Sequence, residues 1–256
     1  MKIKTNNMQQ TLEHLYNILE NESKVVYVRF GDGDFNIMSN TSRCIEHAHS
    51  PELERELLES FEIDHPQYVK GAMLNEPTFN GIDLQPRNQQ ENNTIINFIQ
   101  NKFKVDLFTI YSHVLFTYAC VHQQDIFLDF LNTFIRPKKK MFVGSVDKES
   151  MEKLVGKIDY YVKIPVADVH EQSKFEGAYY SIDEWYPKVL EHIDDVDVVL
   201  PTAGMAGRVL CKRLWNLDKP IHVIELGSIV DAVIGKKSRS WISRAGDFIK
   251  PLLIGE

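Results

Sequence analysis

Short apolar, β-branched runs alternate along this chain of 256 residues with longer stretches in which apolar residues recur every three or four positions. The first pattern is typical of buried strands and the second of amphipathic helices. Because the two alternate, they predict an α/β fold with a mostly parallel sheet. The predicted strands cover residues 24–30, 68–74, 106–112, 140–146, 159–165, 196–202 and 221–226.

The helical pattern is clearest at residues 50–61, where Ser50 is the expected N-cap, Pro51 opens the first turn and Leu53 and Leu57 share one face. The N-terminal 21 residues also predict an amphipathic helix, and they lack the apolar stretch of a secretory signal. Similar patterns predict further helices at residues 90–103, 125–135, 148–158, 181–193 and 206–217.

The whole chain, residues 1–256, is predicted to be a single domain, because no repeat, low-complexity tract or linker interrupts it. Its hydrophobic content of 43% suffices for a substantial core. We therefore expect a Rossmann-like arrangement, in which a twisted, mostly parallel sheet is flanked by helices.

The formal net charge of −7 argues against nucleic acid as a partner, because such a chain repels a phosphate backbone. The three cysteines, Cys44, Cys120 and Cys211, are far apart and form no metal-binding motif. This usage favours a reducing compartment, and a cytoplasmic location is expected.

The first candidate site is the stretch VRFGDGDFNIM, residues 28–38, which follows a predicted strand. An extended backbone would turn Asp32 and Asp34 to the same side, where both carboxylates could hold one divalent cation. Gly31 and Gly33 would let the backbone approach a ligand. Arg29, near the end of a core strand, needs an anionic partner, and a carboxylate of the same loop is one candidate. A solvated turn is the alternative for the two aspartates.

The second candidate site is VVLPTAGMAGRVLCKRL, residues 198–214, in which a buried strand leads through small residues into a helix. Gly204 and Gly207 would leave backbone N–H groups open at the helix start, as in a general anion site. Thr202 and Ala203 lie in the same loop. The stretch matches neither a Walker A loop nor a complete dinucleotide-binding fingerprint. Tight packing of the strand against the helix is the alternative.

Three residues that follow predicted strands are candidates for a general base: Asp168, His170 and Asp231, with Asp231 ranked first. A basic segment at the end of the chain is a candidate for contact with a diphosphate or an anionic membrane surface. A solvated turn is again the alternative. The segment contains Lys236, Lys237, Arg239 and Arg244 around Trp241.

Together, residues 28–38 and the later stretch DVVLPTAGMAGRVL, followed by IHVIELGSIVD, resemble the GT-D glycosyltransferases. The resemblance implies a metal-dependent enzyme that uses Mn²⁺ or Mg²⁺ to move a sugar from a UDP-sugar to a nascent glycan or glycoconjugate. It places Asp32 and Asp34 at the acids of the family's D-x-E motif and Arg29 at its leading arginine. Asp34 stands where the family has Glu.

The second loop of the family falls on Gly204 and Gly207, and Thr202 stands where the family has Ser. Two other functions stay open at this point. One is a methyltransferase that uses S-adenosylmethionine, although the three alternating glycines expected of its first loop are missing. The other is a nonenzymatic nucleotide-sugar binding protein.

Overall fold

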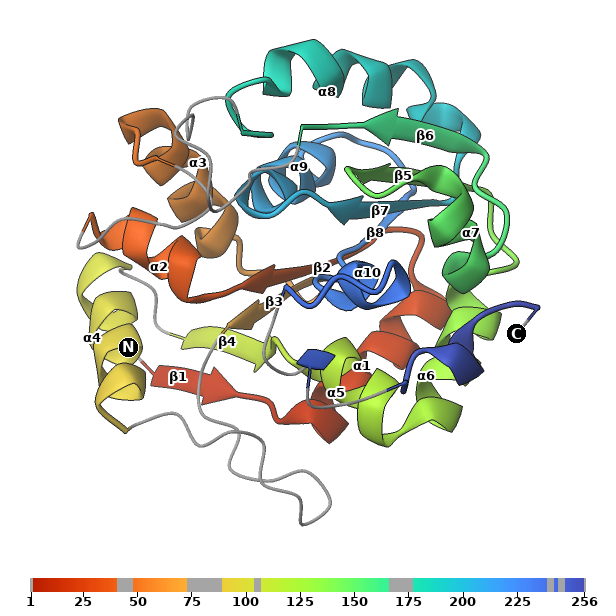
Figure 1. Ribbon diagram of the computed structural model, residues 1–256. Helices are drawn as coiled ribbons and strands as arrows, with labels where there is room; N and C mark the ends of the chain where they lie inside the picture. The colour runs from red at the N-terminus through yellow and green to blue at the C-terminus, as the bar shows by residue number, and fades with distance from the viewer. Residues whose placement is uncertain are drawn as a thin grey trace.

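The computed structural model describes residues 2–40, 48–72, 89–103, 107–165, 177–238, 242–243 and 247–255. Its eight strands form one sheet in the order β1-β4-β3-β2-β8-β7-β5-β6, and all neighbouring strands are parallel (Figure 1). The strands are β1 (Lys2–Thr5), β2 (Val25–Phe30), β3 (Tyr68–Ala72), β4 (Leu107–Ser112), β5 (Lys140–Gly144), β6 (Tyr160–Lys163), β7 (Val198–Thr202) and β8 (His222–Ile224).

Helices cover both faces of the sheet, as expected for parallel strands joined by crossovers. The helices are α1 (Met8–Asn21), α2 (Asp32–Ser39), α3 (Pro51–Glu62), α4 (Gln89–Lys102), α5 (Leu115–His122), α6 (Gln124–Phe130), α7 (Lys148–Val155), α8 (Ile182–Glu191), α9 (Met205–Trp215) and α10 (Ile229–Val233). Three further helical segments are the π-helix η1 (Leu131–Ile135) and the 3₁₀ helices η2 (Ile193–Asp195) and η3 (Lys250–Leu252).

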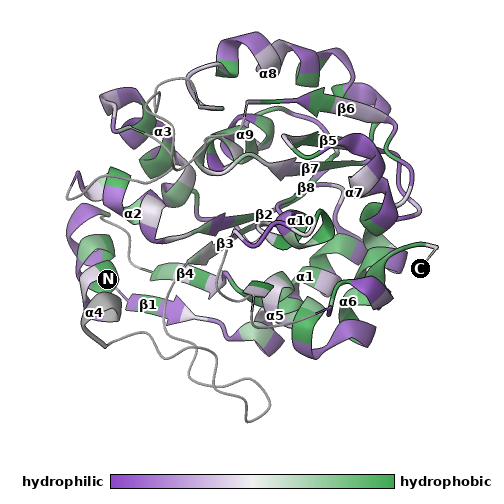
Figure 2. Ribbon diagram, viewed as in Figure 1, coloured by the Kyte–Doolittle hydropathy of each residue, from purple (hydrophilic) through white to green (hydrophobic). Residues whose placement is uncertain are grey.

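The sheet separates two hydrophobic cores. One core joins the strands to α2, α3, α4, α8 and α9, and the other joins them to α1, α5, α6, α7 and α10. The central strands are hydrophobic on both sides, since all residues of β2 except Arg29 are buried. Figure 2 shows that the central strands are more hydrophobic than the edge strand β1, in which two of the four residues are lysines. The predicted α/β class and parallel sheet are confirmed.

The N-terminus differs from the prediction of one continuous helix. Residues 2–5 form the edge strand β1, which pairs with β4, and α1 begins only at Met8. Asn7 caps α1 by accepting a hydrogen bond from the backbone N–H of Gln10. Four residues are too few to show the alternation of apolar and polar positions that predicts a strand. The extended conformation of β1 depends on its pairing with β4.

The predicted start of the helix at residues 50–61 is confirmed. Ser50 accepts a hydrogen bond from the backbone N–H of Leu53 at 3.1 Å, and Pro51 opens α3. α3 packs between α2 and α9, so these three helices form one group beside the central strands (Figure 1). Within the described ranges, no helix combines the length and apolar character needed to cross a membrane.

Candidate active site

The candidate site lies at the carboxyl ends of β2, β8 and β7, which are neighbours at the centre of the sheet. Ligands of open parallel sheets bind outside this edge. Three segments of the chain lie at this edge of the sheet. They are residues 31–34 after β2, residues 225–231 after β8, and residues 202–205, which run from the end of β7 into α9. The two loops predicted from the sequence therefore end on the same edge of the sheet, separated by β8.

The Gly-Asp-Gly-Asp stretch begins a helix, so the predicted extended backbone is wrong. Gly31 is the N-cap of α2, and Asp32 and Asp34 lie in its first turn. Residues two apart in a helix point in nearly opposite directions. Asp32 is exposed, whereas Asp34 is 3% exposed. Carboxylates favour this position because they compensate the partial positive charge of a helix N-terminus.

Asp34 is held by partners from two directions. Its Oδ2 accepts a hydrogen bond from the backbone N–H of Gly31 at 2.7 Å. Its Oδ1 lies 3.2 Å from Nε of Arg208, which belongs to α9. Asp32 makes a different local contact, because its Oδ1 accepts a hydrogen bond from the N–H of Gly33 at 3.0 Å. The two acids of the motif therefore have separate environments.

Arg208 also joins the segments after β7 and β8. Its Nη1 donates to Oε1 of Glu225 at 2.7 Å and to the carbonyl oxygen of Gly204 at 2.6 Å. The other carboxylate oxygen of Glu225, Oε2, accepts a hydrogen bond from the backbone N–H of Arg29 at 2.9 Å. The side chains of Arg208, Asp34 and Glu225 are 13%, 4% and 3% exposed. One guanidinium thus joins all three segments of the edge.

The Arg29 side chain has no acidic partner in the part of the chain that the structure describes. Its Nε donates to the carbonyl oxygen of His113, just after β4, and its guanidinium lies against Gly227. A Cβ on Gly227 would be 1.4 Å from Nη1 of Arg29. Gly71, the β3 residue in register with Arg29, allows the β4 end to approach, since a Cβ there would lie 2.7 Å from the Ser112 carbonyl oxygen. Arg29 as a whole is only partly buried, and a guanidinium is a strong hydrogen-bond donor to anions.

The loop after β7 contains a buried hydroxyl without a hydrogen-bond partner among the described residues, Oγ1 of Thr202. Gly204 follows with φ of 54°, which favours glycine, and α9 begins at Met205. The N–H of Gly207 is not open as predicted, because it donates to the carbonyl oxygen of Gly204 at 2.9 Å. Ala203 is buried, so it contributes to packing.

The structure describes one of the three candidates for the general base. Asp231 lies in α10, beyond the end of β8, and accepts a hydrogen bond from the hydroxyl of Ser238. Asp168 and His170 lie outside the described residues. In the basic segment, Lys236 and Lys237 are exposed, and Arg239, Trp241 and Arg244 also lie outside the described residues.

The described side chains do not form a two-carboxylate cation site. Oδ2 of Asp34 accepts a hydrogen bond from Gly31, and Oδ1 forms an ion pair with Nε of Arg208 that does not have hydrogen-bond geometry. Asp32 is exposed to solvent. No group of three or more His, Cys, Asp or Glu side chains that could hold a metal ion occurs in the described ranges. Asp32 is the only one of the two acids placed to meet a ligand from solvent.

Sequence reasoning missed Arg208 and Glu225. Glu225 could have been identified from the sequence, because an acid is unusual at a core position directly after the hydrophobic run Val223–Ile224. Nothing in the sequence distinguished Arg208, since arginine is common one turn into a helix.

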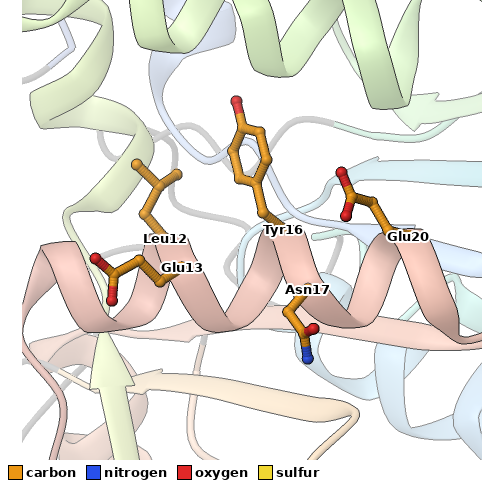
Figure 3. A pocket seen from close by; sticks show the side chains of 5 residues that line it. All are labelled: Leu12, Glu13, Tyr16, Asn17 and Glu20. Carbon is orange, nitrogen blue, oxygen red and sulfur yellow. The ribbon is translucent and has the colours of Figure 1, made fainter.

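A shallow hollow elsewhere on the molecule is lined by Leu12, Glu13, Tyr16, Asn17 and Glu20 of α1 (Figure 3). The hydroxyl of Tyr16 donates to Asp129 at 2.9 Å, and burial raises the pKa of Tyr16 well above its usual value. None of the sequence-predicted site residues lines this hollow.

No protein-family model matches the sequence, and no curated protein matches it significantly. Solved structures match most of the chain. A glycosyltransferase from Streptococcus sanguinis with domain of unknown function 1792 has a TM-score of 0.66 and 17% identity, over 96% of this chain and 87% of that one. A structure of domain of unknown function 1792, described as a distinct glycosyltransferase fold, has a TM-score of 0.63 and 15% identity, over 96% and 83%. The protein therefore shares the fold of these structures.

Proposed function

We propose that the protein is a glycosyltransferase that binds a nucleotide-sugar donor at the carboxyl ends of β2, β8 and β7. The observation that carries this proposal is the Arg29 guanidinium, which lies at the edge of the sheet without an acidic partner in the described residues. A partly buried cation of this kind favours an anionic ligand. The fold shared with a known glycosyltransferase supports the choice of reaction.

The donor would lie across the centre of the sheet. β2 and β7 are separated only by β8, and two strand spacings amount to roughly 10 Å. Arg29 and the Thr202–Gly204 loop would thus contact different parts of one diphosphate-linked sugar. The resemblance of the sequence to the GT-D enzymes favours UDP as the nucleotide and a glycan or glycoconjugate as the acceptor.

In the proposed reaction, an acceptor hydroxyl oxygen forms a bond to the anomeric carbon while the bond from that carbon to the diphosphate oxygen breaks. Arg29 stabilises the negative charge that develops on the departing diphosphate. A base takes the proton of the acceptor hydroxyl, and Asp231 is the described candidate. No step is assigned to Mn²⁺ or Mg²⁺, since the described acids do not form the predicted site.

Isothermal titration calorimetry with UDP, in EDTA and with Mn²⁺, tests the donor site. We expect Arg29→Met to weaken UDP binding by roughly tenfold or more, because a hydrogen bond to a charged group contributes about 1.5–3 kcal/mol. Arg55→Met, at an exposed position on α3, is the control and should bind UDP like the parent. UDP affinity unchanged by Arg29→Met would refute the assignment.

Mass spectrometry with a panel of UDP-sugars tests the reaction. Release of UDP from one sugar donor, increased by an acceptor, is the expected result. A parent that binds S-adenosylmethionine and not UDP would favour the methyltransferase alternative. UDP-sugar binding without any transfer or hydrolysis would favour a nonenzymatic binding protein.

A further inference from the structure

The Arg208 guanidinium has buried acids on two sides, Asp34 of α2 and Glu225 after β8. These acids are 191 positions apart in the sequence, and each is almost completely shielded from solvent. The same guanidinium also donates to the carbonyl oxygen of Gly204, the N-cap of α9, which has a positive φ. We call Asp34, Arg208 and Glu225 the buried triad.

Arg208 compensates charge on both Asp34 and Glu225, and the two acids compensate the charge of Arg208. Desolvation of an ion costs several kcal/mol, and removal of one partner leaves an uncompensated buried charge. Without Arg208, Asp34 and Glu225 would become two buried acids close to one another. Without Asp34, Arg208 would lose its only described acidic partner on the α2 side.

The geometry points to Arg208 as a positioning residue for the donor site. We propose that it holds the start of α2 and the Gly204 turn in one arrangement, and that Asp34 is its anchor and not a cation ligand. The first half rests on the proposed function. Asp32, exposed one residue before Gly33, is then the acid of the motif that faces a ligand.

Thermal unfolding in EDTA separates the two roles of Asp34. As the anchor of Arg208, Asp34→Asn should lower the Tm by about 5–10 °C, since a broken buried ion pair costs several kcal/mol and each kcal/mol shifts Tm by roughly 2–4 °C. Asn keeps the shape of Asp but would turn either an uncharged oxygen or an N–H donor toward Arg208. If Asp34 were a cation ligand, its neutralisation would leave the Tm in EDTA unchanged or higher, and would abolish the Mn²⁺-induced rise.

A double-mutant cycle tests the pairing directly. Asp34→Asn should lower the Tm of the parent but lower it much less in the Arg208→Gln background, where the cationic partner is already absent. Equal shifts in both backgrounds would overturn the pairing. If Arg208→Gln fails to fold, Glu225→Gln takes its place. Neutral Glu225 makes Asp34 the only negative partner of Arg208 among the described residues, so Asp34→Asn should then lower the Tm more than in the parent.

The positioning role is tested by UDP titration, at a temperature well below the Tm of every variant. Arg208→Gln should weaken UDP binding by tenfold or more. The control is Glu56→Gln, which breaks a partly buried ion pair with Lys212 and Arg213 one turn further along α9. It should lower the Tm and leave UDP affinity unchanged. Equal UDP affinity in the two folded variants would overturn the positioning role.

These measurements distinguish failure of this inference from failure of the proposed function. The unfolding cycle requires no donor, so it decides the role of Asp34 even if the parent does not bind UDP. A parent without UDP affinity would refute the donor site, and the positioning role with it.

Discussion

Gly227 and Arg29 occupy adjacent space so closely that a Cβ on Gly227 would lie 1.4 Å from Nη1 of Arg29. Gly227 also has a φ of 68°, which side chains rarely adopt. The segment after β8 therefore requires glycine for two reasons, its own backbone conformation and the guanidinium beside it.

Gly227→Ala is expected to lower stability by about 2–4 kcal/mol and to weaken UDP binding, because the methyl group combines backbone strain with displacement of Arg29. Chemical denaturation and UDP titration measure the two effects. Gly235→Ala is a matched control, since Gly235 has a φ of 70° and no atom within 4 Å of its added Cβ.

The control should lose only the strain energy, about 1 kcal/mol, and keep the UDP affinity of the parent. Equal losses of stability in the two variants would contradict the close packing of Arg29 on Gly227.

Thr202→Val is expected to change stability and UDP affinity in opposite directions. The Thr202 hydroxyl is buried without a partner among the described residues, so its replacement by a methyl group should be neutral or stabilising by up to about 1 kcal/mol. If the hydroxyl binds the donor, UDP affinity should fall severalfold. Thr202→Ser, which keeps the hydroxyl, should retain UDP affinity. A clear loss of stability in Thr202→Val would show that the hydroxyl has a partner in the free protein.

Asp231→Asn is expected to lower the rate of sugar transfer by about 100-fold or more while UDP affinity changes less than twofold, because the base acts on the acceptor and not on the nucleotide. Single-turnover transfer and UDP titration are the measurements. Ser238→Ala removes the hydrogen bond to Asp231 and serves as the comparison. It should lower the rate of transfer much less than Asp231→Asn does. Parent-like transfer by Asp231→Asn would exclude Asp231 as the base.

Stability is expected to fall in acid because of His222. Burial, with a smaller effect of Lys138, lowers the pKa of His222 to about 4. Between about pH 6.5 and 4, the unfolded chain binds a proton at this residue and the folded protein does not. The contribution of His222 is therefore complete above pH 6.5 and is lost as the pH falls toward 4, by up to about 3 kcal/mol.

Denaturation with urea at several pH values between 4 and 7 tests this expectation. His222→Gln should flatten the dependence, whereas the exposed control His192→Gln should retain it. The same slope in the parent and His222→Gln would exclude His222 as its cause.

The pattern of apolar residues along the chain predicts the architecture of the sheet and places the two candidate loops at one of its edges. Seven predicted strands correspond to β2 through β8, because a strand buried on both faces needs a continuous apolar run. The parallel arrangement followed from the helices between them, and it brought the loops after β2 and β7 to one edge. These features depend on local sequence patterns, which are the same whatever tertiary contacts the segments make.

The conformation and the partners of the residues at that edge depend on contacts between elements that are far apart in the sequence. Gly31–Asp34 can form either a turn or a helix start, and packing of α2 against α3 selects the helix. Likewise, β1 is a strand because β4 offers its edge. The contacts of Asp34 with Arg208 and of Arg208 with Glu225 join distant parts of the sequence. Charge compensation in a buried site depends on distance in space, which no local pattern of residues contains.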